Sequence, residues 1–180
     1  APFALREFLH CVLDQGAEFF RHAPERRHKV LLEFASANPT GPLSIAHGRQ
    51  AVVGDVMASV LSFAGDDVQR EYYINDEGKQ ISLFAESVQA RMRELQGLEW
   101  AIPEGGYQGE YVKDTAAALI ADGIAIDDLQ AIREAAVSWN MQHIRATLEK
   151  AGIVFDSWVS QKKIETDGEI HKAIAWLQDN

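Results

Sequence analysis

Hydrophobic positions divide the chain into segments with two different spacings. Between residues 3 and 20, apolar side chains recur every three or four positions, which predicts an amphipathic helix. Short apolar runs follow at 30–34, 67–74 and 153–159, and such runs are typical of strands buried in a parallel sheet. The helical spacing returns between and after these runs, so we expect further helices at 45–64, 77–95, 110–121, 126–150 and around 170–177.

Turn-forming residues separate these segments. Residues 36–42 read Ser-Ala-Asn-Pro-Thr-Gly-Pro, which cannot continue as strand or helix. Asn75 and Asp76 are expected to cap the helix that follows them, and Gly65 and Gly152 are expected to end helices. Strands separated by helices favour right-handed crossovers and a parallel sheet. Because a doubly wound sheet usually has five or six strands, three strands predict the first half of a Rossmann-like α/β sheet with flanking helices.

Composition narrows the class of protein. The 180 residues carry 17 Lys and Arg against 27 Asp and Glu, a net charge of −10, which disfavours nonspecific binding to nucleic acid and suits a cationic small molecule. The single cysteine, Cys11, excludes an internal disulfide and a multi-cysteine zinc site. Six scattered histidines predict no metal site, and no apolar run approaches the roughly 20 residues that span a bilayer. Residue 1 is Ala, so we expect a chain processed or cut from something longer.

The candidate chemistry lies where the first predicted strand joins its helix. In open α/β sheets, ligands bind beyond the carboxyl ends of the strands, and a helix N-terminus offers unpaired N–H groups to phosphate. His47 and Gly48 fall in the first turn of that helix, where His47 could donate to a phosphate oxygen and Gly48 lets a ligand approach the backbone. On spacing alone, a surface histidine beside a helix start is the favoured interpretation of His47. Both standard nucleotide fingerprints, Gly-x-Gly-x-x-Gly and the P-loop, are missing.

Four blocks of the sequence carry a resemblance to a known family. They read LEFASANPTGPLSIAHGR at 32–49, REYYINDEGKQI at 70–81, YQGEYV at 107–112 and GIVFDSWVS at 152–160. These blocks resemble, in the same order, those of the arginyl-tRNA synthetases, a family of class I aminoacyl-tRNA synthetases. The resemblance covers about the first half of that family's catalytic domain and implies the HUP-type class I core.

The resemblance implies three residues that bind arginine. Ser36 and Asn38 match residues that hold the ammonium and carboxylate of the amino acid. Glu33 matches an acidic residue near the substrate guanidinium, and a carboxylate can bond a guanidinium bidentately. From the residues alone, Glu33 could instead be a strand-end carboxylate satisfied by the backbone or a lysine. The block at 70–81 is expected near this site, although its polar residues Tyr73, Asn75 and Gln80 could be structural.

The resemblance also implies a catalytic histidine and a set of ATP-binding positions. His47 matches the second histidine of the family's signature, which contacts the ATP phosphates and the transition state, and Gly48 follows it in the helix turn. Two positions depart from the signature: Ser44 replaces its first histidine and Ala46 replaces its glycine. A serine hydroxyl cannot span the distance of an imidazole, and the Ala46 methyl is expected to crowd adenine. These departures predict a lower ATP affinity.

The resemblance divides the chain into three regions. We expect a linker helix at 1–28, a Rossmann-like catalytic half-domain at 29–165 and the start of an acceptor-stem insertion at 166–180. The family's lysine-containing second signature, its anticodon-binding domain and its small N-terminal domain do not occur in this sequence. The chain is therefore expected to be a fragment that is inactive by itself.

The implied parent enzyme is a cytoplasmic arginine–tRNA ligase. It activates arginine with ATP, with Mg²⁺ expected alongside the ATP, and transfers the arginyl group to tRNA(Arg), which binds the full-length protein. Neither a membrane nor DNA is expected as a partner. The alternative is a non-catalytic truncated paralogue, a module that binds arginine or a nucleotide, and a third interpretation is another nucleotidyl-transferring class I fold.

Overall fold

The computed structural model describes residues 2–20 and 27–179. Its three strands form one parallel sheet in the order β1-β2-β3, with bounds Lys29–Glu33, Asp67–Ile74 and Ser157–Ser160. β1 pairs with β2 along its whole length, whereas β3 pairs only with the carboxyl half of β2, from Glu71 to Ile74. Among the described residues, the outer edge of β1 has no neighbouring strand. The parallel sheet expected from the sequence is confirmed.

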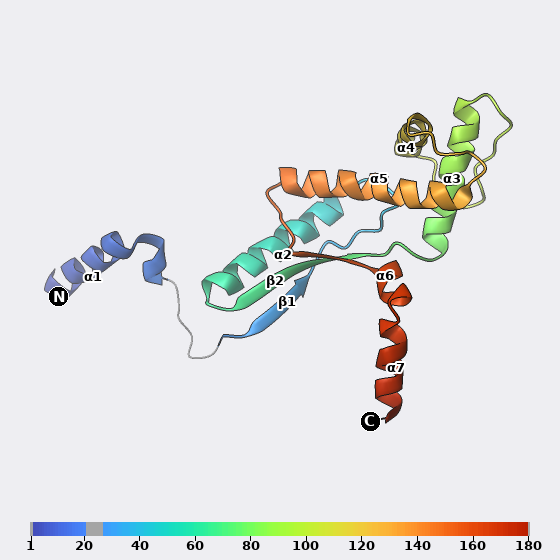
Figure 1. Cartoon of the computed structure of the whole chain (residues 1–180). Helices are drawn as coiled ribbons and strands as arrows, with labels where there is room; N and C mark the ends of the chain where they lie inside the picture. The colour runs from blue at the N-terminus through green and yellow to red at the C-terminus, as the bar shows by residue number, and fades with distance from the viewer. Residues whose placement is uncertain (1, 21–26, 180) are drawn as a thin grey trace.

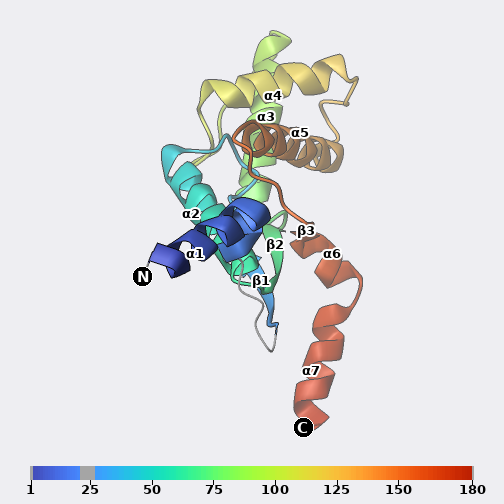
Figure 2. The ribbon, with the colours of Figure 1, turned by 90° about the vertical axis from the view of Figure 1, so that its left-hand side faces the viewer.

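Helix α2 (Ile45–Phe63) connects β1 to β2 and lies against the sheet (Figures 1 and 2). Its buried positions are all small, namely Ala51, Gly54 and Ala58. Gly54 is needed there, because a Cβ at this position would lie 2.2 Å from Cγ of Phe34. The larger side chains of α2 face outward: Val52, Val53, Val56 and Val60 are all more than half exposed. Only a narrow stripe of α2 is therefore packed.

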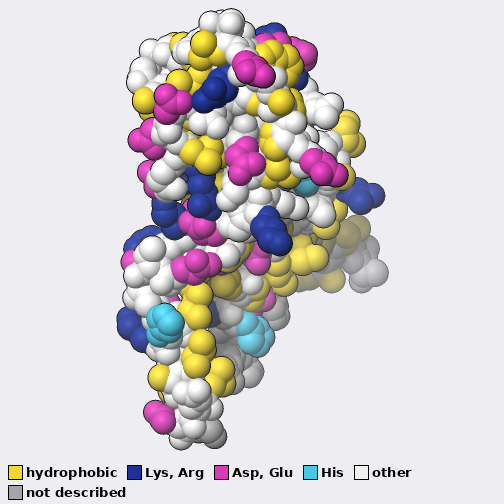
Figure 3. Space-filling view, turned by 90° about the vertical axis from the view of Figure 1, so that its right-hand side faces the viewer, with side chains coloured by type: hydrophobic (Ala, Val, Ile, Leu, Met, Phe, Trp, Pro, Cys, Tyr) yellow, Lys and Arg dark blue, Asp and Glu magenta, His cyan; other side chains and the backbone are white. Residues whose placement is uncertain are grey.

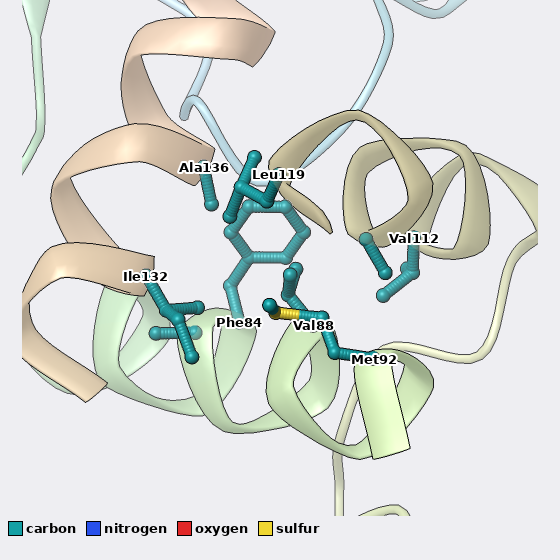
Figure 4. Packing of buried hydrophobic residues seen from close by; sticks show 9 residues of the cluster. Phe84, Val88, Met92, Val112, Leu119, Ile132 and Ala136 are labelled. Atoms are coloured by element: carbon teal, nitrogen blue, oxygen red, sulfur yellow. The ribbon is translucent and has the colours of Figure 1, made fainter. Parts of the chain in front are cut away.

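Three helices form a separate helical unit beyond the carboxyl end of β2 (Figure 1). They are α3 (Lys79–Leu95), α4 (Glu110–Ala121) and α5 (Leu129–Lys150). Apolar side chains spaced by about one turn on each helix meet in a common core, as Figure 4 shows for Phe84, Val88, Met92, Val112, Leu119, Ile132 and Ala136. None of these side chains is more than 1% exposed, so the helical unit encloses its core completely.

A second core joins the sheet to α5. The fully buried Tyr72 of β2 stacks on Trp158 of β3, with ring centroids 4.5 Å apart, and meets Phe155 edge-on at 5.4 Å. From α5 come Met141, Ile144 and Leu148. Because α5 contributes to both cores, this one long helix fixes the helical unit to the sheet.

Helices at both ends of the chain project away from the sheet (Figure 1). At the N-terminus these are α1 (Pro2–Gln15) and the 3₁₀ helix η1 (Gly16–Phe20), and at the C-terminus α6 (Gln161–Thr166) and α7 (Glu169–Asp179). Figure 3 shows hydrophobic side chains along the projecting α6–α7 segment and charges of both signs above it. Residues 21–26 of the predicted 1–28 linker lie outside the described residues. In residues 2–20 and 27–179, no helix is both long and apolar enough to cross a membrane.

The predicted cap of the third helix is wrong. α3 begins at Lys79, and Gly78 precedes it with no side-chain hydrogen bond to the helix. Asn75 instead donates to Asn38, and Asp76 accepts hydrogen bonds from Ser160 Oγ (2.6 Å) and a backbone N–H. Both side chains therefore bond to residues far away in the sequence instead of capping the helix that follows them.

Two features near the C-terminus also differ from the prediction. The third strand begins only at Ser157, because the buried Ile153 and Phe155 belong to an irregular segment that fills the second core. The predicted last helix, around 170–177, is α7, and the sequence did not indicate the short helix α6 that precedes it. Gly168 divides the two helices, and its φ of 76° belongs to the left-handed region that ends helices. An apolar run indicates burial, but burial alone does not distinguish a strand from a packed irregular segment.

Candidate active site

The loop between β1 and α2, residues 34–43, turns through an unusual backbone conformation. Ala35 and Ser36 both have positive φ, at 66° and 27°, which non-glycine residues rarely adopt. The amide of Ser36 donates to the carbonyl of Phe34 at 2.9 Å and closes a tight turn directly after the strand. A conformation of this kind persists only where the surrounding structure holds it in place.

Two buried side chains from other elements hold the loop. Tyr72 of β2 donates its hydroxyl to the carbonyl of Ala37 at 2.9 Å, and Asn140 of α5 donates Nδ2 to the carbonyl of Pro39 at the same distance. Burial raises the pKa of the Tyr72 phenol to about 12, because a phenolate would be desolvated there. The loop is therefore fixed from two sides, by the sheet and by the helical unit.

Ser36 and Asn38, the predicted arginine-binding residues, lie in one hydrogen-bond network. Ser36 Oγ accepts from the backbone amide of Tyr73 at 3.1 Å. The Asn38 carboxamide donates Nδ2 to Gln80 Oε1 at 2.7 Å and accepts at Oδ1 from Asn75 Nδ2 at 3.1 Å. Each of these two side chains keeps one unused donor hydrogen and one unused lone pair. The block at 70–81, which the sequence placed near the site, thus contacts it directly.

Ser44 and His47 form a capping box at the start of α2. The Ser44 hydroxyl accepts from the His47 amide at 3.4 Å, and the Ser44 amide donates to Nδ1 of His47 at 3.1 Å. Because an N–H can only donate, Nδ1 is an acceptor, and the proton of the neutral ring is therefore on Nε2. Ser44, which departs from the family signature, therefore orients the ring of His47, the predicted catalytic histidine.

The other two predicted ATP-binding positions flank this histidine. Ala46 is exposed in the first turn of α2, so its methyl group points into open surroundings rather than into the core. At Gly48, no atom lies within 4 Å of where a Cβ would be. The backbone amide of Gly48 donates to the carbonyl of Ser44 at 3.0 Å, which makes the first helical hydrogen bond. The surface over the helix start is therefore open to a ligand.

Glu33 ends β1 and lines a pocket of about 510 Å³ between β1 and α2. Ser36 and Arg49 line the same pocket, while Asn38, Ser44, Ala46, His47 and Gly48 do not. No hydrogen bond or ion pair occupies the Glu33 carboxylate among the described residues. The structure thus brings Glu33 and Ser36 to one pocket and leaves His47 at the neighbouring helix start.

Sequence reasoning missed Tyr72 and Asn140 as supports of the loop. Asn140 lies on the packed face of α5 beside Met141 and Ile144, and it is 2% exposed. A polar side chain at such a position needs a buried hydrogen-bond partner, so this pattern was a usable signal. The sequence does not indicate that the partner lies 101 residues away.

Comparison with known proteins gives one consistent result. Residues 9–113 match the profile of a family described as tRNA synthetases class I (R), catalytic domain. The arginine–tRNA ligase of Thermotoga petrophila is 40% identical over 97% of this chain and 33% of its own length. The chain therefore spans about a third of the length of the curated relatives that it matches.

Solved structures agree with the sequence matches. A Campylobacter jejuni structure assigned to the arginyl-tRNA synthetases superposes with a TM-score of 0.78 at 32% identity, covering 89% of this chain and 36% of that one. The arginyl-tRNA synthetase of Thermus thermophilus superposes with a TM-score of 0.59 at 26% identity, covering 94% of this chain and 30% of that one. The predicted half of a class I synthetase core is confirmed.

Proposed function

The chain belongs to the class I arginyl-tRNA synthetases, and from this premise we propose that it supplies part of the catalytic site of an arginine–tRNA ligase. In the proposed reaction, a carboxylate oxygen of arginine attacks the α-phosphorus of ATP and pyrophosphate leaves. The terminal ribose hydroxyl of tRNA(Arg) then attacks the arginyl carbonyl, and AMP leaves. The observation that carries the proposal is the loop at 34–43, which is anchored at the carboxyl end of β1 by Tyr72 and Asn140.

We assign recognition of the arginine main chain to Ser36 and Asn38. Each has one donor hydrogen left for a carboxylate oxygen and one lone pair left for an ammonium. Both are held at their other polar atoms by β2 and the start of α3, which reduces the entropy lost when a ligand binds. Two fixed side chains that can each donate and accept a hydrogen bond suit the ammonium and carboxylate of an amino acid.

We assign the guanidinium to Glu33. Its carboxylate is exposed, lines the pocket and has no partner among the described residues. A guanidinium can bond such a carboxylate with two parallel N–H donors. The net charge of −10 adds a long-range attraction for a cationic substrate.

We assign the ATP phosphates to His47 and the N-terminus of α2. The proton on Nε2 and the partial positive charge of the helix start would stabilise negative charge that develops on the α-phosphate. Gly48 leaves room for the ligand. The Ala46 methyl is exposed at the same helix start, and we expect it to reduce the space for adenine. Mg²⁺ is expected alongside the ATP, where it would neutralise part of the phosphate charge. Residues 2–20 and 27–179 contain no group of three His, Cys, Asp or Glu side chains that could hold a metal.

A non-catalytic module that binds arginine or a nucleotide is the second candidate. Ser44 favours it, because this hydroxyl is engaged with the His47 amide and is too short to replace an imidazole at the phosphates. Under either candidate, the 180 residues alone are expected to show negligible turnover. The two candidates differ in what happens when the remaining parts of a synthetase are supplied.

A chimera separates the two candidates. This chain replaces the matching third of the Thermotoga petrophila ligase, and arginine-dependent ATP–pyrophosphate exchange is measured with tRNA(Arg) present. We expect exchange that falls about 100- to 1000-fold in His47→Ala, since one preorganised donor at a reacting group contributes that much. His10→Ala, on the exposed surface of α1, is the matched control and is expected to keep wild-type exchange.

The contrary result is equally clear. A folded chimera whose exchange is no higher than that of His47→Ala excludes the ligase. Binding of arginine or ATP to that same chimera, measured by calorimetry, would then support the module.

A further inference from the structure

The carboxamide of Asn38 is held between two other amides. Its Nδ2 donates to Gln80 Oε1 at 2.7 Å, and its Oδ1 accepts from Asn75 Nδ2 at 3.1 Å. Asn75 follows the last residue of β2, and Gln80 lies in the first turn of α3, so they are 37 and 42 residues from Asn38. The loop, the sheet and the helical unit therefore meet at this one side chain.

Asn38 has a defined direction between its two partners in the structure. The oxygen and nitrogen of a carboxamide have nearly the same shape, so only hydrogen bonding decides which end faces which neighbour. In the structure the oxygen of Gln80 faces Asn38 Nδ2, and the amide nitrogen of Asn75 faces Asn38 Oδ1. In this arrangement Asn38 presents one N–H and one lone pair to a ligand, and reversal of all three amides together would exchange their positions.

We propose that Asn75 and Gln80 are positioning residues that orient the Asn38 carboxamide and thereby set the affinity of the site for the zwitterionic end of arginine. This inference rests on the proposed function, since it requires Asn38 to contact the amino acid. Neither residue supports the packing: Gln80 is exposed and Asn75 is only partly buried, and neither belongs to a core cluster. Their described polar contacts are with Asn38, so their role is to fix its direction.

Two amide-to-acid substitutions test the direction, because the same chemical change is expected to act oppositely at the two positions. A glutamate at position 80 still offers an oxygen to Asn38 Nδ2, whereas an aspartate at position 75 places an acceptor against Asn38 Oδ1. In the chimera, Gln80→Leu should raise KM for arginine about tenfold, and Gln80→Glu should restore it to within about threefold of wild type. Asn75→Asp should raise KM for arginine more than about tenfold. KM for ATP should stay unchanged in all three variants.

Gln69→Leu supplies the matched control. Gln69 is exposed on the amino-terminal half of β2, away from the loop, and the change removes the same atoms as Gln80→Leu. Equal KM values for arginine in wild type and Gln80→Leu would overturn the positioning role. A rise in KM for Gln80→Glu that equals the rise for Gln80→Leu would overturn the direction, as would an unchanged KM in Asn75→Asp.

A second readout needs neither a substrate nor the chimera. In the ¹⁵N-labelled 180-residue chain, the Asn38 side-chain amide should give one proton that is shifted downfield and exchanges slowly, assigned by its absence in Asn38→Asp. The shift and the protection should persist in Gln80→Glu and disappear in Gln80→Leu. If they are identical in wild type and Gln80→Leu, the proposal fails even where the ligase is active. If they behave as expected while the chimera is inactive, the orientation stands and the proposed function fails.

Discussion

The helical unit and the sheet region of this chain differ in how completely they cover their apolar side chains. Phe84, Val88 and Leu119 of the helical unit are at most 1% exposed, whereas Val53 and Val60 of α2 are 55% and 60% exposed. The sheet region also leaves one edge of β1 unpaired among the described residues. Stability is therefore concentrated in the helical unit, while the candidate site lies on the sheet region and depends on α5 for support.

The largest expected effect comes from emptying the closed core. Phe84→Ala leaves a cavity among three helices and should lower the free energy of unfolding by about 3–5 kcal/mol, as measured by urea denaturation. A loss below about 1 kcal/mol would contradict the division between the two regions. It would mean that the helical unit is no more tightly packed than α2.

The contact between α2 and the sheet predicts the next largest effect. In Gly54→Ala the new methyl would meet the ring and Cβ of Phe34, so we expect a loss of about 1–3 kcal/mol in the free energy of unfolding. Gly48→Ala, in the same helix but facing open space, is the control, and it should stabilise by up to about 1 kcal/mol. Similar denaturation midpoints for the two variants would show that the packing of Gly54 against Phe34 does not determine the stability of the sheet region.

Tyr72→Phe tests the anchor of the loop and its dependence on pH. Loss of the hydrogen bond to Ala37 should cost about 1 kcal/mol near pH 8. The folded-state pKa of Tyr72, about 12, is above the ordinary value of 10, so folding favours the protonated phenol. Its contribution is complete below pH 10 and is lost as the pH rises toward 12. The advantage of wild type over Tyr72→Phe should therefore shrink across that window and change sign before pH 12. Parallel curves would exclude a buried phenol.

The smallest effect is expected on the outer face of α2. Val53→Ala should change the free energy of unfolding by no more than about 0.5 kcal/mol, because this side chain is already largely solvated. Val88→Ala removes the same atoms from the closed core and should cost about 2 kcal/mol. Equal losses of unfolding free energy in Val53→Ala and Val88→Ala, measured by thermal or urea denaturation, would show that the helical unit and the sheet region do not differ in packing.

Periodicity predicted most of the fold because the elements follow local rules. β2 has the expected bounds, and α4 and the ends of α3 and α5 lie where the apolar spacing and the glycines place them. It could not identify the packed face of α2, since the valines that reveal the helix are exposed and the buried stripe is made of small residues. Periodicity also could not show whether Asn75 caps α3 or bonds to the distant Asn38, because the same side-chain amide can do either.

The place of the candidate site followed from the rule for open α/β sheets, but the roles of its residues could be predicted only through the resemblance. Spacing alone left His47 as a surface histidine or a phosphate ligand, and the roles of Glu33, Ser36 and Asn38 came entirely from matching blocks. The structure adds what no local pattern contains, namely the contacts between the loop at 34–43 and residues far along the chain. The roles of these residues toward arginine and ATP stay predictions until the chimera is assayed.

The hydrogen bond from Asn140 to Pro39 has a consequence for the order of events during translation. The two residues are 101 positions apart. At a synthesis rate of about 5–20 residues per second, roughly 5–20 s separate their addition to the nascent chain. For that interval the loop lacks one of its two buried anchors, although β1 and α2 on either side of it are already made. The loop thus acquires its second buried anchor only after α5 has been synthesised.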